Sequence, residues 1–388
     1  MKKILFVTSQ LLIGGTETAL LETVKLLKAE DVDITVAVFK PGGELFNTFT
    51  EYCNVNDLSN QYSKALITKN TIIQNIKSLR IFSAIKNLWI KVSEKYFVSH
   101  FKFKENISNR MPKDPNEYDI AVAYSAPYTS SVPYVLDKIS AKRKLAWIHF
   151  DVADYIKEID VSDFSDCYER LDKIICVSEA SKKSFITRHP SLKEKTAVAY
   201  NPIDTAMILS KAQESVDTNI DNKFAICSVG RLTYDKGIDI SICAHKLLKD
   251  NGYSIKWLVC GEGDYRSTLE EKIKESGLEK DFILLGNQKN PYKYMNAADI
   301  YVQTSRTESY CLTLAEARVL KKPIVTTNIP TATEHVTNGH NGYICNMDAE
   351  SVANAIEQLI NSPELRQKFS ENTNPIDCDN SALKKLFE

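Results

Sequence analysis

Short, continuous apolar runs alternate with longer amphipathic stretches along this 388-residue chain. The runs Lys3–Thr8 (KILFVT) and Ile34–Phe39 (ITVAVF) are β-rich, and a helix-like stretch, Thr16–Ala29, lies between them. Strands that are apolar throughout are typical of parallel sheets covered by helices on both faces. We therefore expect an α/β protein of the doubly wound, Rossmann-like class.

The alternation restarts after residue 200, which indicates two domains. Asn201–Pro202 breaks regular structure, so we place the domains at 1–202 and 203–374. Further strands of the first domain are expected at Asp119–Tyr124, Leu145–His149 and Lys173–Val177. In the second domain we expect a helix at Ile238–Lys249 and strands at Ala225–Val229, Lys256–Cys260, Phe282–Leu285, Asp299–Gln303, Pro323–Thr327 and Gly342–Cys345.

The composition excludes several classes of protein. The 49 basic and 50 acidic residues leave a net charge of −1, which argues against a nucleic-acid binder. An apolar fraction of 43% excludes a disordered chain. No run is typical of a membrane span or a signal peptide, so we expect a cytoplasmic protein. The nine cysteines form no C-x-x-C pair or metal-ligand cluster, and we expect buried, reduced thiols.

Residues 61–113 differ from the rest of the chain. They contain eleven lysines and arginines against two glutamates, a net charge of +9. We expect one or two basic amphipathic helices, with aromatic residues such as Trp89 and Phe97 among the lysines. Two interpretations stay open: a helical face packed on its own domain, or a docking surface for an anionic membrane at the inner face of the cell. No nucleic-acid recognition motif accompanies the charge.

In doubly wound domains ligands bind beyond the carboxyl ends of the strands. In the first domain this edge offers Gly14-Gly15, a phosphate-loop feature or a tight turn, and His149 with Asp151. In the second it offers GRLTYDKG, whose Arg231 and Lys236 either converge on a diphosphate or are two exposed loop cations.

The most specific indication of a binding site is a pair of carboxylates in ESYCLTLAEA. Glu308 lies in a loop beside the N–H groups that open an apolar helix, and Glu316 lies just over one turn into that helix. They are suited to bind sugar hydroxyls and a ribose diol. The alternative is an acidic residue that complements the helix dipole and a surface glutamate.

These segments together resemble one enzyme family. GRLTYDKG, LVCGEGDY, ESYCLTLAEA and KKPIV are similar to the retaining glycosyltransferase family 4 of the GT-B fold. KKILFVTSQLLIGGTET, WIHFD, ICVSEASK and YNPID match its landmarks in order, so the resemblance spans Lys3–Gly342. It implies two Rossmann-like domains facing across a cleft, an acceptor-binding domain 1–202 and a nucleotide-sugar-binding domain 203–374. A C-terminal segment, 375–388, would cross back to the first domain.

The resemblance also implies residue roles. Arg231 and Lys236 would hold the diphosphate, Glu308 the donor sugar and Glu316 the ribose. His149 would face the donor sugar from the other domain. The remaining donor-binding residues would be Gly14, Gly15, Gly230, Asn287, Gln288, Ser309, Tyr310, Cys311 and Leu312.

The sequence departs from the family at four positions. Ser309 and Cys311 stand where many members have glycine, and Arg318 and Lys321 replace residues that are usually small. These departures leave the donor sugar open.

The implied reaction is sugar transfer with retention from a nucleotide diphosphate donor, a UDP-sugar, without metal or cofactor. The acceptor would be a glycan or lipid-linked glycan in bacterial capsule or surface polysaccharide synthesis. Cations and a helix N-terminus would stabilise the leaving diphosphate. The alternatives are a sugar-nucleotide epimerase or a phosphorylase on the same architecture, and a non-catalytic partner subunit.

Overall fold

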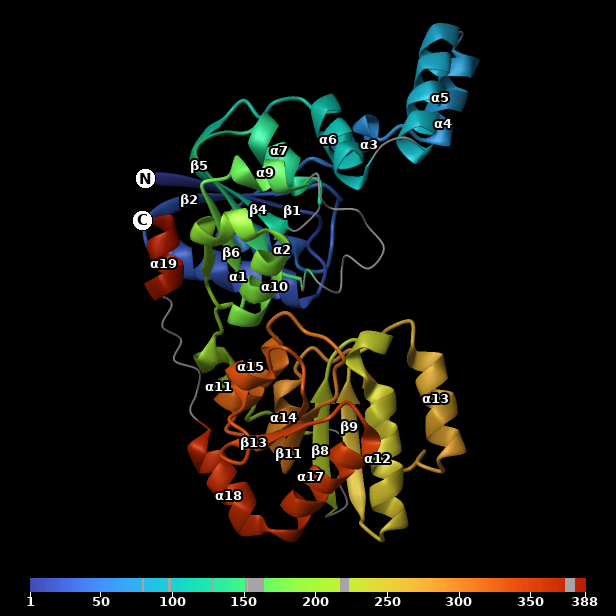
Figure 1. The fold of residues 1–388 in the computed structure, drawn as a ribbon, viewed down its shortest axis with the longest axis vertical. Helices are drawn as coiled ribbons and strands as arrows, with labels where there is room; N and C mark the ends of the chain where they lie inside the picture. Colours follow the sequence, from blue (N-terminus) through green and yellow to red (C-terminus); the bar gives the residue numbers. More distant parts are fainter. Residues whose placement is uncertain are drawn as a thin grey trace. The chain divides into compact units, whose positions relative to one another are not determined.

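The computed structural model describes residues 1–78, 80–96, 99–126, 129–150, 152, 164–216, 223–373 and 381–388. The chain divides into two compact units (Figure 1). Unit 1 comprises Met1–Asn201 with Asn380–Glu388, and unit 2 comprises Pro202–Asp379. Each unit contains one parallel sheet with helices, as the apolar runs predicted.

The sheet of unit 1 has the order β3-β2-β1-β4-β5-β6-β7. The chain runs outward from β1 and then returns to its other side, since Ile4 is paired with both Ile34 and Ile120. The gap between β1 and β4 is therefore the topological switch point of this sheet. The strands are β1 (Lys2–Thr8), β2 (Val32–Val38), β3 (Asn54–Asp57), β4 (Glu117–Ala126), β5 (Ser140–Ile148), β6 (Lys173–Cys176) and β7 (Thr196–Val198).

The last helix of the chain, α19, packs on the sheet of unit 1. The Phe387 ring centroid lies 5.6 Å from that of Phe6, and the Lys2 Nζ donates to the Phe387 carbonyl at 2.8 Å. Of the expected crossover, residues 375–380 lie outside the described residues. The helices of unit 1 are α1 (Gly15–Lys28), α2 (Phe46–Tyr52), α3 (Ser59–Ala65), α4 (Lys69–Lys77), α5 (Ile81–Tyr96), α6 (His100–Arg110), α7 (Ser131–Lys138), α9 (Phe164–Glu169), α10 (Glu179–Arg188), the 3-10 helix η1 (Pro190–Lys195) and α19 (Ser381–Phe387).

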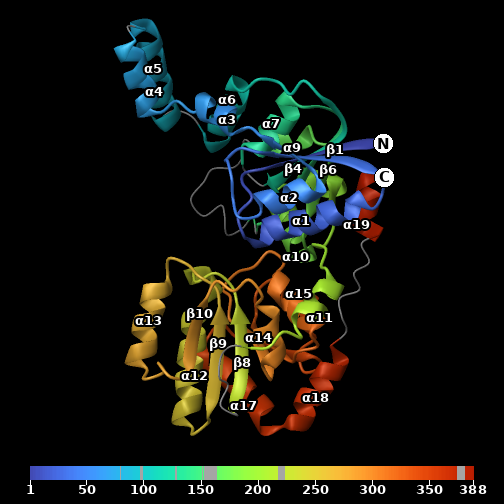
Figure 2. The same ribbon diagram turned by 180° about the vertical axis from the view of Figure 1, so that it is seen from behind.

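Unit 2 repeats the plan with the order β10-β9-β8-β11-β12-β13, and its switch point lies between β8 and β11. Strands β10, β9 and β8 lie side by side in Figure 2. Alternate strand residues enter two cores: Trp257 packs on one face of the sheet and Leu258 on the other. The strands are β8 (Phe224–Val229), β9 (Ile255–Cys260), β10 (Phe282–Gly286), β11 (Ile300–Gln303), β12 (Ile324–Thr327) and β13 (Gly342–Cys345). The helices are α11 (Thr205–Lys211), η2 (Tyr234–Lys236), α12 (Ile238–Asp250), α13 (Arg266–Glu275), α14 (Tyr292–Ala297), α15 (Leu312–Val319), α16 (Ala332–His335), α17 (Ala349–Asn361) and α18 (Pro363–Asn372).

The structure corrects the expectation of one or two helices in 61–113, because α3 to α6 are four separate helices. Side-chain caps divide them. The Thr68 hydroxyl accepts from the Thr71 N–H at the start of α4, and the Ser99 hydroxyl accepts from the Lys102 N–H at the start of α6. The aromatic residue Phe97 lies outside the described residues.

The cysteine expectation was wrong for one described thiol. Cys243 is exposed on α12 and Cys53 is half-buried, whereas the other six described cysteines are buried. All eight are free thiols. The Cys243 thiol is exposed because it lies on the face of α12 that is turned away from the sheet.

Across the stretches of chain that the structure describes, no helix has both the length and the apolar character needed to cross a lipid bilayer.

Candidate functional site

The switch point of unit 2 brings two loops together. The loop after β8 leads into η2, and the loop after β11 leads into α15. Gly237 follows η2 with φ of +63°, and a Cβ there would lie 2.0 Å from the Thr304 carbonyl oxygen. The Thr304 hydroxyl donates to the Gly237 carbonyl at 2.8 Å. Only glycine allows this approach of the two loops.

Arg306 fastens the same two loops. Its Nη1 and Nη2 donate to the Asp239 carboxylate at 2.9 and 2.8 Å, and its Cζ lies 3.9 Å from the centroid of the Tyr234 ring. Burial would raise the pKa of Asp239, but the hydrogen bond and the charge of Arg306, with smaller contributions from its surroundings, together outweigh burial, and the pKa lies below its usual value. Sequence reasoning missed Arg306, although it stands two residues before Glu308.

Lys236 and Glu308 meet between these loops. The Lys236 Nζ donates to Glu308 Oε1 at 2.7 Å, and the two side chains are only 15% and 13% exposed. The Ser305 hydroxyl donates to the same oxygen at 2.9 Å. Burial would lower the pKa of Lys236, but the Glu308 carboxylate outweighs burial and the pKa is raised. Lys236 is therefore a permanent cation and not an exposed loop lysine.

The amino end of α15 lies directly after Glu308. Its N-cap residue, Cys311, has the left-handed conformation with φ of +63° and ψ of 72°. Burial raises the pKa of the Cys311 thiol, so it stays protonated. The Tyr310 carbonyl accepts from His335 Nε2, which fixes the backbone before the helix. First-turn N–H groups have no partner within their own helix, so this end of α15 favours an anion or a hydroxyl group.

Glu316 lies one turn into α15 and is not a surface glutamate. The Tyr292 hydroxyl donates to Glu316 Oε1 at 3.1 Å. Burial raises the pKa of this carboxyl to about 7, and the hydrogen bond only partly offsets that effect. Near neutral pH the carboxyl both donates and accepts hydrogen bonds, which suits a diol.

Of the other predicted residues of unit 2, Gly230 lies next to this pair, since a Cβ there would lie 3.8 Å from the Lys236 side chain. Arg231 is exposed, and Gly230 donates its N–H to the Cys260 carbonyl at 3.0 Å. The Gln288 amide donates to the Leu285 carbonyl at 2.7 Å, so its donor is used within the fold. Asn287 is exposed.

Comparison with known proteins shows what the domain that carries this site is similar to. Residues 210–374 match the family model described as Glycosyl transferases group 1. The chain contains a glycosyl transferases group 1 domain. The Lys236–Glu308 pair, α15 and Glu316 all lie within the matched residues.

Individual relatives support the same assignment. The capsular polysaccharide biosynthesis glycosyltransferase CapM of Staphylococcus aureus is 28% identical over 208 residues, which are 51% of this chain and 55% of CapM. A Campylobacter jejuni enzyme, named N-acetylgalactosamine-N,N'-diacetylbacillosaminyl-diphospho-undecaprenol 4-alpha-N-acetylgalactosaminyltransferase, is 29% identical over 204 residues, or 52% and 54% of the two chains. The chain thus spans about half the length of these curated relatives.

The fold also matches solved structures. The crystal structure of Anabaena HepE in complex with UDP and glucose has a TM-score of 0.74 at 18% identity, and the match covers 100% of both chains. This likeness confirms the predicted fold class, two Rossmann-like units of the GT-B type.

Unit 1 holds the predicted residues that lie outside the group 1 domain. Gly14 caps α1 with φ of −165°, an extended conformation that any residue adopts, and Gly15 begins that helix. His149 follows β5, is 5% exposed, and its ring centroid lies 4.3 Å from that of Tyr124. Burial lowers the pKa of His149 to about 3, so the ring is neutral. Asp151 lies outside the described residues.

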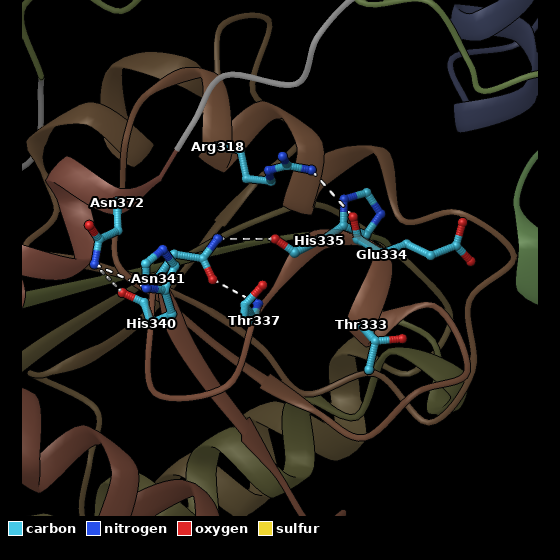
Figure 3. Close-up of a pocket in the computed structure, with 8 residues that line it drawn as sticks. All are labelled: Arg318, Thr333, Glu334, His335, Thr337, His340, Asn341 and Asn372. Carbon is cyan, nitrogen blue, oxygen red and sulfur yellow. Dashed lines mark hydrogen bonds between the residues drawn. The ribbon is translucent and has the colours of Figure 1, made fainter.

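A polar cavity of roughly 200 Å³ adjoins the amino end of α15, because its lining residue His335 donates to the Tyr310 carbonyl (Figure 3). Arg318 lines it and donates to the Glu334 carbonyl at 3.3 Å, while burial lowers the pKa of the guanidinium. Arg318, which replaces a residue that is usually small in the family, therefore shapes this cavity. The cavity lining does not include Lys236 or Glu308. The lining residues are Arg318, Thr333, Glu334, His335, Thr337, His340, Asn341 and Asn372.

Among the described residues, no three histidine, cysteine, aspartate or glutamate side chains are grouped so that they could hold a metal ion.

Proposed function

We propose that this chain is a retaining, family 4-type glycosyltransferase that moves a sugar from a UDP-sugar to a glycan or lipid-linked glycan acceptor in surface polysaccharide synthesis. The observation that carries the proposal is the Lys236–Glu308 pair at the switch point of the group 1 domain. In this assignment the domain 203–374 binds the donor and the domain 1–202 binds the acceptor.

Lys236 stabilises the leaving diphosphate. Negative charge develops on the phosphate oxygen as the sugar leaves, and a cation held in place beforehand lowers the barrier. The raised pKa of Lys236 keeps it charged throughout. Exposed Arg231 adds a forked, bidentate contact to the same diphosphate, and the first-turn N–H groups of α15 add the helix dipole.

Glu308 binds the donor sugar rather than attacking it. Its Oε1 accepts from both Lys236 and Ser305, which fixes the carboxylate and directs Oε2 to sugar hydroxyls. A carboxylate bonded to an ammonium group is a weak nucleophile. The anomeric configuration is then retained without a protein nucleophile, because the leaving phosphate itself takes the acceptor proton. Glu316 binds the ribose diol.

His149 acts as a neutral hydrogen-bonding group toward the donor sugar, because its pKa of about 3 excludes a charged role near neutral pH. The reaction needs no cofactor and no metal, since Lys236, Arg231 and the helix dipole supply the charge that a metal ion would otherwise supply.

The names of the relatives support the acceptor class. CapM is named for capsular polysaccharide synthesis, and the Campylobacter enzyme is named for an acceptor linked to diphospho-undecaprenol. The Anabaena structure holds UDP and glucose, which supports a UDP-sugar donor.

A donor screen tests the proposal. The full chain is incubated with UDP- and GDP-sugars, with and without lipid-linked glycan, and the products are followed by NMR. We expect release of UDP and a product with the anomeric configuration of the donor. An inverted product, or an altered nucleotide sugar formed without acceptor, would overturn it; the latter is the behaviour of an epimerase.

A further inference from the structure

The long helix α5 of unit 1 carries an apolar face that points into solvent. Its six members are between 43% and 92% exposed, Phe82 being the most exposed and Trp89 reaching 73%. They recur three and four positions apart and cover roughly a third of the helix circumference. The members are Ile81, Phe82, Ile85, Leu88, Trp89 and Val92.

Helix α4 extends this surface. It lies beside α5 in both views of the ribbon (Figures 1 and 2) and adds Ile73 and Ile76, which are 48% and 55% exposed. Of the described side chains in the two helices, only Ala84 is buried. We call the eight exposed side chains the α4–α5 apolar face. Exposed apolar side chains gathered on two neighbouring helices mark an interaction site.

The neighbouring helix α6, by contrast, packs on the core of its own unit. Its Phe101 and Phe103 pack against the core of unit 1, and Ile107 is 1% exposed. The two interpretations of residues 61–113 therefore apply to different helices. Helix α6 turns its apolar side chains inward, as α3 does with Tyr62 and Ala65.

Basic side chains surround the α4–α5 apolar face. Residues 69–92 contain five lysines and arginines and no acidic residue. At 100° per residue, Lys86 and Lys91 lie on opposite sides of the apolar face of α5. Long basic side chains place their charge at the edge of an apolar surface while their stems lie along it. The five are Lys69, Lys77, Arg80, Lys86 and Lys91.

We propose that the α4–α5 apolar face docks on an anionic lipid bilayer. The apolar side chains would enter the boundary between headgroups and acyl chains, and the flanking lysines would meet lipid phosphates. A second copy of the chain is a poorer occupant, because pairing two such faces would bring like charges together. This surface is distinct from the Lys236–Glu308 site, and its test needs no turnover, so the two proposals can fail separately.

Vesicle sedimentation tests the proposal with the full chain. The protein is mixed with phosphatidylcholine vesicles or with equimolar phosphatidylcholine and phosphatidylglycerol. We expect sedimentation with the anionic vesicles that weakens at high salt, because salt screens the attraction of the lysines. Equal, negligible sedimentation with both vesicle types would overturn the proposal.

Two paired variants locate the contact. We expect Phe82→Ser with Trp89→Ser, and separately Lys77→Glu with Lys86→Glu, each to weaken partitioning by about tenfold or more. Matched controls change exposed residues elsewhere: Leu247→Ser, at 40% exposure, and Lys183→Glu. Wild-type partitioning of both paired variants would contradict the assignment, as would a dimer in lipid-free solution that Phe82→Ser abolishes.

Trp89 supplies a second readout that does not depend on how the variants fold. The chain has three tryptophans, and the other two, Trp147 and Trp257, are 0% exposed. Anionic vesicles should therefore shift the emission of Trp89 to shorter wavelength, and brominated acyl chains should quench it. Trp89→Phe should remove the shift and keep sedimentation. Sedimentation of the wild type without any shift would place the contact elsewhere and overturn the proposal.

Discussion

The carboxyl group of Glu316 is half-buried beside Tyr292, and burial sets its pKa at about 7 against an ordinary value of 4.5. A carboxyl with a raised folded-state pKa stabilises the fold fully below pH 4.5 and loses that contribution as pH rises through 7. Between roughly pH 4 and pH 8 the loss amounts to about 3 kcal/mol.

Glu316→Gln should remove this pH dependence, because glutamine still accepts from Tyr292 and cannot ionise. The free energy of unfolding of both proteins, measured by urea titration across that pH range, checks it. We expect the variant to gain stability relative to the wild type as pH rises. Parallel profiles would show that Glu316 is ionised at an ordinary pKa.

The backbone of Cys311 is held in the left-handed region, where a Cβ costs about 1 kcal/mol and glycine costs nothing. We therefore expect Cys311→Gly to be more stable than Cys311→Ala by about 1 kcal/mol. The same pair of changes at buried Cys345, in strand β13, should give the opposite order. The prediction fails if alanine is preferred at both positions in denaturant titrations.

Residue-level roles were only partly predictable. The sequence placed Lys236 and Glu308 in loops that follow two different strands, but their 2.7 Å contact depends on how β8 and β11 pair in space. From the sequence alone, Arg306 is indistinguishable from a surface loop residue. Only the fold brings Asp239, 67 positions away, to the Arg306 guanidinium. The burial of Glu316 depends likewise on Tyr292, from another helix.

At the scale of elements, the Arg306–Asp239 pair joins the loop before α15 to the first turn of α12. The pair is bidentate and partly buried, so a double-mutant cycle with Arg306→Ala and Asp239→Ala should give a coupling of about 1 kcal/mol. Both variants should also slow turnover, because Glu308 loses its fixed position. Zero coupling together with unchanged turnover would show that the pair does not hold the site.

Strand boundaries followed the apolar runs to within two residues for every predicted strand but β5, which begins at Ser140, five residues before its predicted start, because its first half is partly exposed. Strands β8 and β9 begin one residue before the predicted positions, and β13 was predicted without error. The edge strands β3 (NVND) and β7 (TAV) were missed, because a short, partly exposed strand lacks a continuous apolar run. The number of helices in 61–113 depends on the Thr68 and Ser99 caps, each of which begins a new helix.

At the scale of the whole molecule, each unit has its own core, and the C-terminal helix α19 belongs to that of unit 1. Phe387 is 4% exposed and also lies 6.4 Å from the Trp147 ring. Phe387→Ala should destabilise unit 1 by about 3 kcal/mol, through lost contacts and the cavity left behind.

Hydrogen exchange can locate that loss. Phe387→Ala should speed exchange in β1 and β5 and leave β8 and β9 unchanged. Phe369→Ala, in the core of unit 2, is the matched control and should do the reverse. Equal acceleration in both sheets would contradict the assignment of α19 to unit 1 alone.

The two-unit plan was predictable because the alternation of strands and helices restarts after residue 200. The break lies at Asn201 and Pro202, where the sequence places a turn. The exposed face of α4 and α5 was not predictable in the same way. A basic amphipathic sequence is compatible with packing inward, as α6 does, or with facing solvent, and only the tertiary structure separates the two.

The central claim is that Lys236 and Glu308 carry sugar transfer from a nucleotide diphosphate donor. The direct measurement is turnover of the UDP-sugar that the donor screen selects, with Lys236→Ala and Glu308→Ala set against Lys274→Ala and Glu275→Ala, two exposed residues of α13. We expect kcat to fall roughly a hundredfold or more in each site variant and to stay near wild type in both controls. Near-wild-type turnover in both site variants would contradict that claim.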